Sequence, residues 1–531
     1  MKNGDRVKNF VVFGAIAILA ACSTSTVSAP ENESSSSSSV KSVLEESSSS
    51  NKNSSEAESS SSSSKKVSEN CNGTPGIAWD GTTAKSFACG NGTASNPYIV
   101  LTAEQLAYLS FVTNASESEY AGKFFKLGAD ILLSDSDILN KKGELTADSG
   151  KLVKWTPIGN SDVKFTGNFD GDGYTVSGIF INTTSSHNGL FGNSSGTVQN
   201  VTVSDSWIQG GKQTAGIVGY NTGTIQNVSN KATVIGTENV GGIVGASSYK
   251  GSFTASKIKR VVNSGNISGS KQVGGIVGSA SYAEIDSAQN TAQINGSGLV
   301  GGIAGKINNQ EENFVRALKN SGKISGTHFT GGILGACGGS TSVYSNGSSS
   351  GNCMWLYLDC GKIQNAINEA DVEGASYTAG ITGFVCEGTV TGAGNTGKIS
   401  GENYSGGVFG KTISSTTKNL FNRETVTGKI YVGGIAGDNE EGVTSSAYTT
   451  AKVDGDSLVG NMIGYNYNAT MADYYYLSSN GQEPFGANNG GGSATAKTET
   501  EMTSEKFLEL LGEGWTLENS QDGGFPNLSG N

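Results

Sequence analysis

The chain has 531 residues, and glycine accounts for 78 of them, about twice its ordinary share. Six prolines are too few for a proline-rich disordered chain. The net charge is −12, and after the first residues the basic side chains are adjacent at most in pairs, such as the lysines at residues 65–66. We therefore expect no nucleic acid partner, because phosphate binding needs a concentrated basic face.

The N-terminus has the pattern of an export signal. Residues 1–9 carry three basic side chains, and the apolar run from Phe10 to Ala21 is too short to span a bilayer. Leu19–Cys22 resembles the lipobox of bacterial lipoproteins. The resemblance implies a signal peptide at residues 1–21, a diacylated Cys22 as the mature N-terminus, and, because Ser23 follows, an outer-membrane address. The alternative is an ordinary signal sequence with an incidental cysteine.

Residues 22–70 form a low-complexity segment with three pure serine runs. Such a segment cannot bury enough apolar surface to offset the entropy lost on ordering. We expect it to act as a flexible tether between the lipid and the folded part. In composition it resembles the polyserine linkers of some fibre-degrading bacteria.

Six cysteines follow Cys22, and an even count in an exported chain favours disulfides over a metal site. Their spacing and their lack of neighbouring histidines do not fit zinc. We expect Cys71 and Cys89 to pair locally. The other four allow three connectivities, and our working hypothesis joins Cys353 to Cys360 and Cys337 to Cys386. The six are Cys71, Cys89, Cys337, Cys353, Cys360 and Cys386.

Residues 71–150 are predicted to form an N-terminal capping region. Thr102 and Gln105 have capping-box spacing at the start of a helix that continues through Leu109. Residues 124–133 have strand character. A helix placed before a repeat array is a natural cap, because the first repeat otherwise leaves an open strand edge.

The central part of the chain repeats one phrase, a glycine pair, an aliphatic residue, one further residue and a closing glycine. The spacings between closing glycines are 27, 26, 33, 27, 30, 48, 27, 27 and 27 residues. A period of 27 with insertions is typical of a repeat architecture. The closing glycines are Gly192, Gly219, Gly245, Gly278, Gly305, Gly335, Gly383, Gly410, Gly437 and Gly464.

Seven asparagines recur in register, each followed four residues later by Val or Ile and six residues later by glycine. Short strands with one obligatory aliphatic residue fit the stacked rungs of a β-solenoid. Glycines suit its corners, where φ can be positive and neighbouring rungs crowd. Stacked asparagines can bond to one another and to the turn backbone. They are Asn230, Asn263, Asn290, Asn320, Asn368, Asn395 and Asn422.

The predicted fold is all-β, a right-handed parallel β-helix with rungs of about 27 residues over residues 151–470. Its handedness follows from the crossover rule. Residues 71–150 supply a small cap that contains a helix, and residues 471–531 a C-terminal helical cap. A propeller is the main alternative, although 27 residues are few for a four-stranded blade.

Four segments together resemble the GLUG-motif family of bacterial surface proteins: residues 155–159, 169–178, the Gly-Leu-Phe-Gly stretch at 189–192, and Gly-Phe-Pro at 524–526. The likeness covers roughly residues 79–531 and implies a β-repeat protein of the adhesion type. The molecular function of that family is largely uncharacterised.

No catalytic motif stands out, and we expect no enzyme activity, cofactor or metal. Polysaccharide lyases and glycosidases on β-helices need clustered carboxylates on one face. Asp371 and Glu373 flank Val372 and should point outward as solvated edge acids, and the same holds for Asp454 and Asp456. Residues 170–173, Asp-Gly-Asp-Gly, lack further calcium ligands and are predicted to form a tight turn.

Binding is the more plausible role. The insertions all fall between a closing glycine and the next ladder asparagine, so they should leave the scaffold at one edge, where recognition is usually placed. The 48-residue copy holds Tyr344, Trp355 and Tyr357, which could contact a glycan or an extracellular protein. Alternatively, these side chains fold back over the solenoid flank. The predicted protein is a lipid-anchored adhesin at the bacterial surface, with a passive spacer and a polysaccharide-active enzyme as alternatives.

Overall fold

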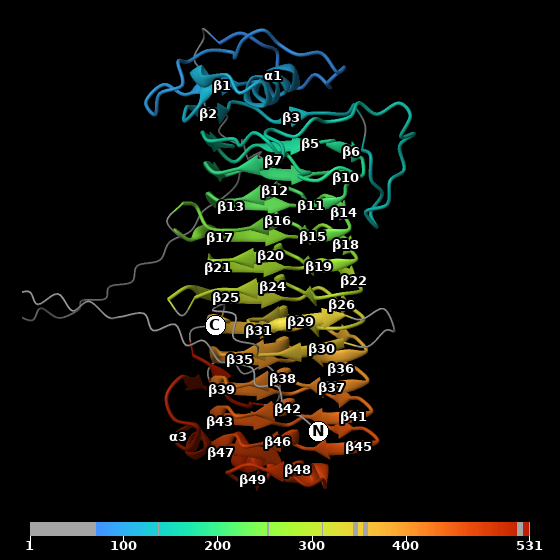
Figure 1. Ribbon diagram of the computed structural model, residues 1–531, viewed down its shortest axis with the longest axis vertical. Coiled ribbons are helices and arrows are strands. Elements are labelled where there is room, and N and C mark those ends of the chain that lie inside the picture. The colour runs from blue at the N-terminus through green and yellow to red at the C-terminus, as the bar shows by residue number, and fades with distance from the viewer. Residues whose placement is uncertain are drawn as a thin grey trace, which may run out of the picture. The chain divides into compact units, whose positions relative to one another are not determined.

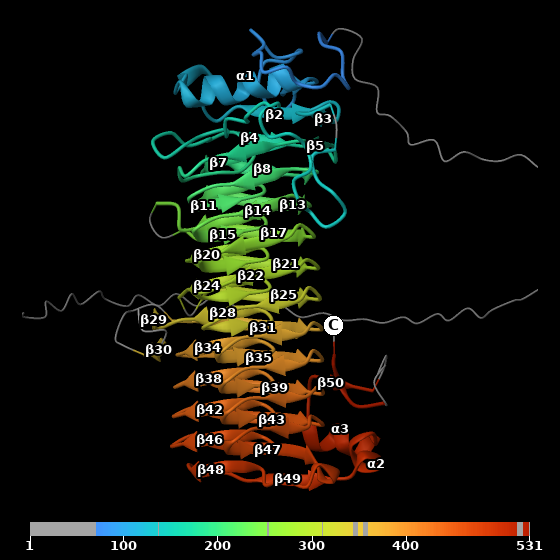
Figure 2. The same cartoon turned by 90° about the vertical axis from the view of Figure 1, so that its right-hand side faces the viewer.

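In a computed structural model, the chain coils into a parallel β-solenoid (Figures 1 and 2). The structure describes residues 71–135, 137–251, 254–310, 312–343, 349–353, 359–517 and 524–529, which lie in one compact unit. Each complete rung passes through four parallel sheets in a fixed order, and every strand pairs with the equivalent strand of the next rung. The predicted fold class is confirmed.

Sheet 1 has 17 strands, and seven of them end at the ladder asparagines. Its strands are β1 (Tyr98–Val100), β2 (Phe124–Leu127), β3 (Ile131–Leu132), β4 (Asn168–Asp170), β5 (Thr175–Ser177), β8 (Thr197–Gln199), β9 (Thr202–Ser204), β13 (Thr224–Asn230), β17 (Ser256–Asn263), β21 (Ala283–Asn290), β25 (Phe314–Asn320), β31 (Gly361–Asn368), β35 (Gly388–Asn395), β39 (Thr416–Asn422), β43 (Val443–Thr449), β47 (Thr470–Leu477) and β49 (Ala494–Lys497).

Sheet 2 has ten short strands that carry the Val or Ile four residues after each asparagine. They are β6 (Phe180–Asn182), β10 (Trp207–Gln209), β14 (Thr233–Ile235), β18 (Ile267–Gly269), β22 (Ile294–Gly296), β26 (Ile324–Ser325), β32 (Val372–Glu373), β36 (Ile399–Ser400), β40 (Val426–Thr427) and β44 (Val453–Asp454).

Sheets 3 and 4 meet at the glycine motif, with nine and 11 strands. Sheet 3 contains β11 (Lys212–Ala215), β15 (Glu238–Gly241), β19 (Lys271–Gly274), β23 (Val300–Gly301), β27 (Thr330–Gly331), β33 (Ser376–Ala379), β37 (Asn403–Gly406), β41 (Ile430–Gly433) and β45 (Ser457–Gly460). Sheet 4 contains β7 (Phe191–Ser194), β12 (Val218–Asn221), β16 (Val244–Ser247), β20 (Val277–Ser281), β24 (Ala304–Asn308), β28 (Leu334–Cys337), β34 (Thr382–Cys386), β38 (Phe409–Ile413), β42 (Ala436–Glu440), β46 (Ile463–Tyr467) and β48 (Phe485–Asn489).

The core is a stack of aliphatic side chains along the inside of the coil. The aliphatic residue of every glycine motif is buried, as the sequence predicts. These residues are Leu190, Ile217, Ile243, Ile276, Ile303, Ile333, Ile381, Val408, Ile435 and Met462. Because each rung adds equivalent side chains to the same columns, the core grows with the number of rungs.

The seven predicted asparagines form a continuous buried ladder. The side-chain amide of each of the first six donates to the Oδ1 of the next asparagine across 2.7–2.8 Å. All seven amides also donate to a backbone carbonyl two residues ahead. Both predicted kinds of partner are therefore present. At the next rung Thr449 takes the asparagine position, and its hydroxyl accepts from the backbone of Ala451.

The motif glycines are required because a larger side chain would collide with neighbouring atoms, and not because the backbone is left-handed there. None of the paired glycines after Gly192 has a positive φ, which differs from one part of our expectation. A Cβ added to Gly275 would lie 2.6 Å from Oδ1 of Asn290. Crowding against the ladder and the neighbouring rung therefore explains the glycine pair.

The N-terminal end of the stack is covered by helix α1 (Ala103–Asn114), which lies across it (Figure 2). The hydroxyl of Thr102 caps the helix by accepting from the backbone of Gln105. Leu106 and Leu109 are fully buried. A disulfide joins Cys71 to Cys89. A short 3-10 helix, Ser118–Tyr120, precedes β2.

The C-terminal segment folds back along the outer face of sheet 1. Helices α2 (Glu499–Met502) and α3 (Glu505–Leu511) follow a 3-10 turn, Ser478–Asn480, and the last strands. A short antiparallel pair, β50 (Trp515–Thr516) and β51 (Asn527–Leu528), completes it. The helices lie beside β43 and β47 (Figure 2), so they cover a flank of the last rungs.

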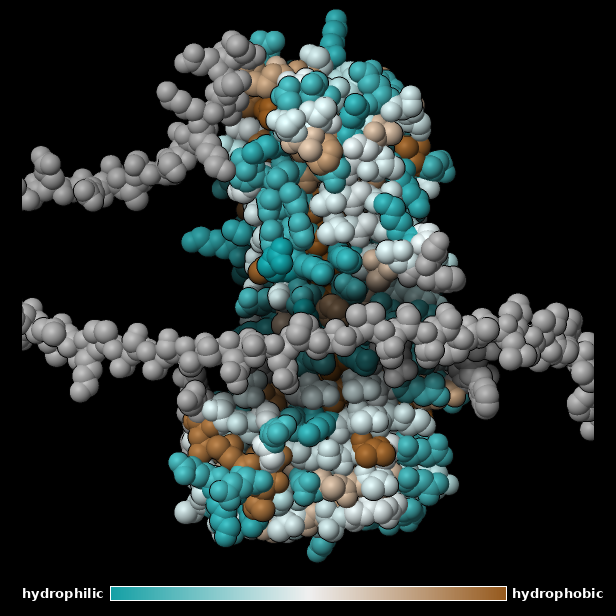
Figure 3. Space-filling model, turned by 90° about the vertical axis from the view of Figure 1, so that its left-hand side faces the viewer, coloured by the Kyte–Doolittle hydropathy of each residue, from teal (hydrophilic) through white to brown (hydrophobic). Residues whose placement is uncertain are grey.

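Among the described residues, no helix combines the length and the apolar character needed to cross a bilayer. The surface at the left of Figure 1 is mostly hydrophilic or neutral, with its hydrophobic residues in separate patches (Figure 3).

Candidate functional site

The insertions leave the solenoid at one edge, as predicted. Each extra segment lies between a strand of sheet 4 and the following strand of sheet 1, namely residues 248–255, 309–313 and 338–360. The last segment contains the antiparallel hairpin β29 (Ser340–Val343) and β30 (Ser349–Asn352), which projects from the stack in Figure 2. The candidate ligand residues Tyr344, Trp355 and Tyr357 lie outside the described residues, as does Cys22.

The disulfides of this insertion differ from our hypothesis. Cys337 bonds to Cys360, and Cys353 bonds to Cys386. The expected pair of Cys337 with Cys386 fails because Cys337 is in register with Val385. Successive side chains of a strand point to opposite faces, so Cys337 faces the core and Cys386 faces outward.

Together the two bonds hold the insertion at two points. The Cys337–Cys360 bond closes its base, since Cys337 ends β28 and Cys360 directly precedes β31. The Cys353–Cys386 bond ties the end of the hairpin to the outer face of β34. The described part of the insertion is therefore fixed to the scaffold.

The hairpin covers aromatic side chains on the outward face. The backbone of Gly351 packs against the ring of Phe384, where an added Cβ would lie 2.5 Å from a ring carbon. Phe329, Tyr377 and Phe384 form a cluster outside the core of the coil. Their side chains point away from that core and are nevertheless buried. The stem of the insertion thus folds back over the flank.

Beyond the hairpin, a row of tyrosines continues down sheet 3. The rings of Phe329, Tyr377, Tyr404 and Tyr431 stack with centroids 4.6–4.7 Å apart and planes within 16° of parallel. Tyr404 and Tyr431 are half-buried. Because the ring faces cover one another, the row presents ring edges to solvent.

The row is built on an unfavourable backbone position. Tyr377, Tyr404 and Tyr431 have φ of +52°, +56° and +60°. Asn239 and Gln213 adopt the same conformation at the equivalent position of earlier rungs, so it belongs to the geometry of the coil. A bulky residue in this region costs about 1–3 kcal/mol, which stacking worth about 0.5–1.5 kcal/mol per aromatic pair offsets in part.

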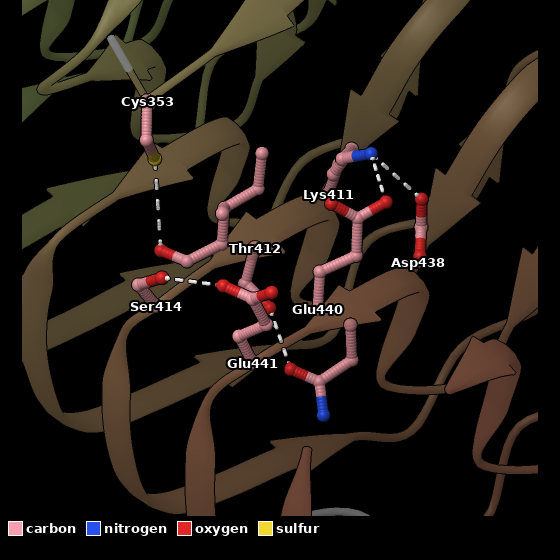
Figure 4. A network of polar contacts seen from close by, with 9 residues as sticks. Cys353, Lys411, Thr412, Ser414, Asp438, Glu440 and Glu441 are labelled. Carbon is pink, nitrogen blue, oxygen red and sulfur yellow. Dashed lines mark hydrogen bonds and ion pairs between the residues drawn. The ribbon is translucent and has the colours of Figure 1, made fainter. Parts of the chain in front are cut away.

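Beside the tyrosines, on sheet 4, lies a compact cluster of charges (Figure 4). Lys411 Nζ is 3.0 Å from Asp438 Oδ2 and 2.5 Å from Glu440 Oε1. It also lies 5.7 Å from the centroid of the Tyr404 ring, within cation–π distance. We call Tyr404, Lys411, Tyr431, Asp438, Glu440, Tyr465 and Tyr467 the corner site, because they surround the corner between sheets 3 and 4.

The charges of the corner site are strongly perturbed by burial. The side chain of Asp438 is only 3% exposed, and burial raises its pKa to about 6 despite the nearby ammonium of Lys411. Burial alone would lower the pKa of Lys411, but the two carboxylates outweigh it and raise that pKa. Oδ1 of Asp438 is buried without a hydrogen-bond partner among the described residues. Burial also raises the pKa of Tyr404 to about 12.

A short polar ladder supports this cluster from inside the coil. Thr412 donates to Asn439 across 2.7 Å, and Asn439 donates to Asn466 across 3.2 Å. Asn466 in turn donates to Asn488 across 2.8 Å. The strands that carry Lys411 and Asp438 are therefore held in register by their inward-facing neighbours.

Sequence reasoning missed the corner site, although a signal was present. Lys411 and Asp438 each follow a closing glycine directly, and adding one 27-residue period to Asp438 gives Tyr465. The three residues pair in register in the structure. Asp438 and Glu440, which share the ammonium of Lys411, are not among the acids that the sequence analysis singled out.

The acids singled out from the sequence have ordinary surroundings. Asp371 and Glu373 are exposed on either side of buried Val372, as predicted. Glu373 pairs with Lys323 across 2.6 Å. Asp454 and Asp456 are also exposed.

The Asp-Gly-Asp-Gly segment forms the tight turn that the sequence predicts. Asp170 Oδ1 accepts from the backbone of Asp172 across 2.8 Å and from Asn200 across 2.9 Å. Asp172 also pairs with Lys126. Within the described ranges, no three His, Cys, Asp or Glu side chains are placed together to hold a metal ion.

No protein-family model matches the chain. A stretch covering 33% of it is 30% identical over 183 residues to Halomucin from Haloquadratum walsbyi, and spans 2% of that protein. Another, covering 23%, is 36% identical over 127 residues to a protein of Evansella cellulosilytica named "Putative Gly-rich membrane protein", and spans 12% of it. The chain thus matches only a small part of each relative.

Among solved structures, the chain is similar to one described as "a putative immunoglobulin A1 protease from Bacteroides ovatus". The alignment covers 83% of this chain and 95% of the other, with 14% identity and a TM-score of 0.28. A score this low gives no basis for transferring an activity. The three disulfides of the described part indicate an extracytoplasmic protein, and the GLUG-motif resemblance stays a prediction.

Proposed function

We propose that this protein is a surface-displayed binding protein that is anchored by lipid at Cys22 and contacts a glycan through the corner site. The solenoid serves as a rigid support for that site. The serine-rich segment between Cys22 and the first rung serves as the tether that holds the site away from the membrane.

The observation that supports binding most directly is the burial of Asp438 on the outward face of a sheet. Outward positions of a solenoid rung accept many polar residues, as Ser279 and Lys306 illustrate on the same column. A buried carboxylate with a raised pKa and an unpartnered oxygen costs stability that such a position does not require. Strongly perturbed groups of this kind concentrate at functional sites.

The chemistry of the corner site favours a hydroxyl-rich ligand. Asp438 and Glu440 offer carboxylate oxygens that accept hydrogen bonds, and Lys411 offers a donor beside them. Tyr467, 41% exposed, and Tyr465 stack on each other and add two aromatic rings, each with a hydroxyl group. This combination of aromatic surface and charged hydrogen-bonding groups suits a sugar, whose rings present apolar faces and polar edges.

A lipid anchor at Cys22 fits the export signal and the membrane-protein name of one relative. We expect the wild-type protein to partition into detergent with an acylated N-terminal Cys22, and the Cys22→Ser variant to remain unprocessed. Mass spectrometry of the mature N-terminus checks this. An unmodified N-terminus elsewhere in the wild type would contradict the anchor.

The ligand is tested with the purified chain on a glycan array and, in parallel, on an array of extracellular-matrix proteins. Tyr467→Ala and Asp438→Asn should each weaken binding at least about tenfold. Tyr249→Ala is the matched control, because Tyr249 is 40% exposed and lies on a different insertion. If the control lowers binding as much as Tyr467→Ala, or if neither array is bound, the corner site is not a glycan site.

The clustered carboxylates also support a second candidate, a polysaccharide-active enzyme. Asp438 has a pKa of about 6 and lies next to a second carboxylate, and general acid–base catalysis works best with a pKa near the operating pH. Incubation of a bound polysaccharide with wild-type protein, followed by product analysis, separates the two functions. New reducing ends or unsaturated products that disappear in Asp438→Asn indicate an enzyme, and an unchanged polymer indicates a binding protein.

A further inference from the structure

The strands of sheet 1 share a kink at one register position. One residue in each of ten successive rungs has φ between +51° and +74°, and these residues lie directly above one another in the ladder. We call them the kink column: Asn200, Asn227, Arg260, Ser287, Ala317, Asn365, Gly392, Asn419, Ser446 and Asp473. The kink column follows the solenoid axis along sheet 1, and we call the strip of surface beside it the groove.

At its C-terminal end the groove is filled by the protein's own chain. Asn419 donates to the carbonyl oxygen of Glu513 across 3.0 Å, and Ser446 donates to that of Leu511 across 2.6 Å. The indole of Trp515 donates to Ser446 across 2.9 Å. Side chains of the kink column therefore bind the main chain of a polypeptide segment.

Apolar side chains next to the column complete this docking. Phe421 and Tyr448, each two residues after a member of the kink column, pack with Trp515 and Phe507. The guanidinium of Arg423 lies 4.6 Å from the Phe421 ring and donates to the carbonyl of Pro526. At this end, the groove therefore holds a polypeptide through hydrogen bonds to main-chain carbonyls, packing against the large side chain of Trp515, and the cation of Arg423.

At the N-terminal end the same groove is open. A cavity of about 520 Å³ lies on it, lined among others by Asn200, Asn227 and Arg260 of the kink column. Val262, two residues after Arg260, is 36% exposed and takes the position that Phe421 and Tyr448 hold further down. The open end therefore has both features of the filled end, an apolar side chain beside the kink column and polar side chains in the column.

The free end also has a positioned cation. Arg260 Nε donates to Asn227 Oδ1 across 2.6 Å, Asn227 donates to Asn200 across 3.0 Å, and Asn200 donates to Asp170. This chain of hydrogen bonds fixes the guanidinium at the lower end of the cavity.

Within the described ranges no carboxylate pairs with Arg260, whereas Lys259 and Arg316 nearby pair with Glu284 and Asp286. Asp172, at the upper end, is paired with Lys126.

We propose that the open end of the groove binds an extended polypeptide segment of another protein that carries a carboxylate side chain. The segment lies along the kink column as the C-terminal segment does at the other end. Its carboxylate pairs with the outer N–H groups of Arg260, which are arranged for a bidentate contact. This surface is separate from the corner site and does not depend on the proposed glycan function.

The test uses the purified full chain and short fluorescein-labelled peptides that differ only in a central Glu, Gln or Lys. Fluorescence anisotropy should show the Glu peptides binding most tightly, with affinity that falls as salt is raised. Arg260→Gln should weaken the Glu peptides about tenfold or more and abolish the preference. Glutamine tolerates this backbone, since Gln213 has φ +55°.

Asn227→Gly keeps the left-handed backbone, removes the support of Arg260 and should also weaken the Glu peptides. Asn365→Gly is its matched control, because Asn365 occupies the same column away from the cavity, and it should leave binding unchanged. Unfolding curves show whether each variant remains folded. Equal affinity for the three peptides, unchanged binding by Arg260→Gln, equal losses in the two glycine variants, or displacement by polysaccharides and not by acidic peptides would each overturn the proposal.

Discussion

The side-chain amide of Asn290 donates to Oδ1 of Asn320, one rung further along the solenoid, across 2.8 Å. The same amide donates to the carbonyl of Ala292. Replacing Asn290 by leucine leaves these buried backbone and side-chain groups without partners, which should lower the free energy of unfolding by about 1–3 kcal/mol. Urea unfolding monitored by circular dichroism measures the change.

Two further variants calibrate that result. Gln289→Leu is the matched control, because Gln289 is the adjacent residue of β21 and points out of the core, and it should change stability by less than about 0.5 kcal/mol. Ile303→Asp places a carboxylate in the aliphatic stack and should destabilise more than Asn290→Leu. Unfolding curves for Asn290→Leu and Gln289→Leu that coincide would show that the ladder does not stabilise the coil.

The motif glycines give a second prediction about the corners. Gly275→Ala should destabilise by about 1–3 kcal/mol, as overpacking does, because the new methyl group would meet Asn290 and the neighbouring rung. Gly251→Ala is the control, since an added Cβ there has no atom of the structure within 4 Å. The difference between their thermal midpoints is the test, and equal midpoints would mean that the corner can relax.

The repeated part of the fold could be predicted from the sequence because every rung solves the same packing problem. The spacing from Asn290 to Ile294 and Gly296 places one inward aliphatic residue and one tight corner in each turn. Deviations from the period then identify the insertions and the edge where they leave. Asn320 and Ile324 repeat the same spacing, so their positions in the fold follow from the pattern alone.

The corner site was less accessible, because it depends on outward residues that change from rung to rung. Lys411 and Asp438 occupy equivalent positions with opposite charges, and only their stacking creates a buried ion pair. The disulfide pairing failed for a related reason. A shift of one residue moves a side chain to the other face of a strand, and spacing alone did not show that Cys386 is shifted in this way.

Removal of one disulfide should loosen the hairpin without unfolding the solenoid. Cys353→Ser combined with Cys386→Ser frees the end of β30 from β34, so Phe384 and Tyr377 lose their cover. We expect faster hydrogen exchange in residues 376–386 and in the hairpin, together with unchanged exchange in β14 and β18. The matched variant Cys71→Ser with Cys89→Ser should affect only the N-terminal cap. Uniform acceleration along the chain would contradict this local role.

The last prediction concerns the pH dependence that Asp438 confers. Its folded-state pKa of about 6 lies above the ordinary value of about 3.9. Between these values the native state therefore binds the proton more tightly than the unfolded chain does. The contribution of this carboxyl group to stability is favourable at low pH and is lost as pH rises through 6.

Asp438→Asn removes this titration and leaves the other groups in place. We expect the free energy of unfolding of the wild type, minus that of the variant, to rise by about 1 kcal/mol when the pH falls from 7 to 5. Urea unfolding of both proteins at the two pH values measures the difference, in which contributions from unrelated groups cancel. Glu373→Gln is the control for removing a carboxylate, because Glu373 is exposed on the same solenoid. A difference that stays constant, or that falls toward pH 5, would show that Lys411 and not burial controls the ionisation of Asp438.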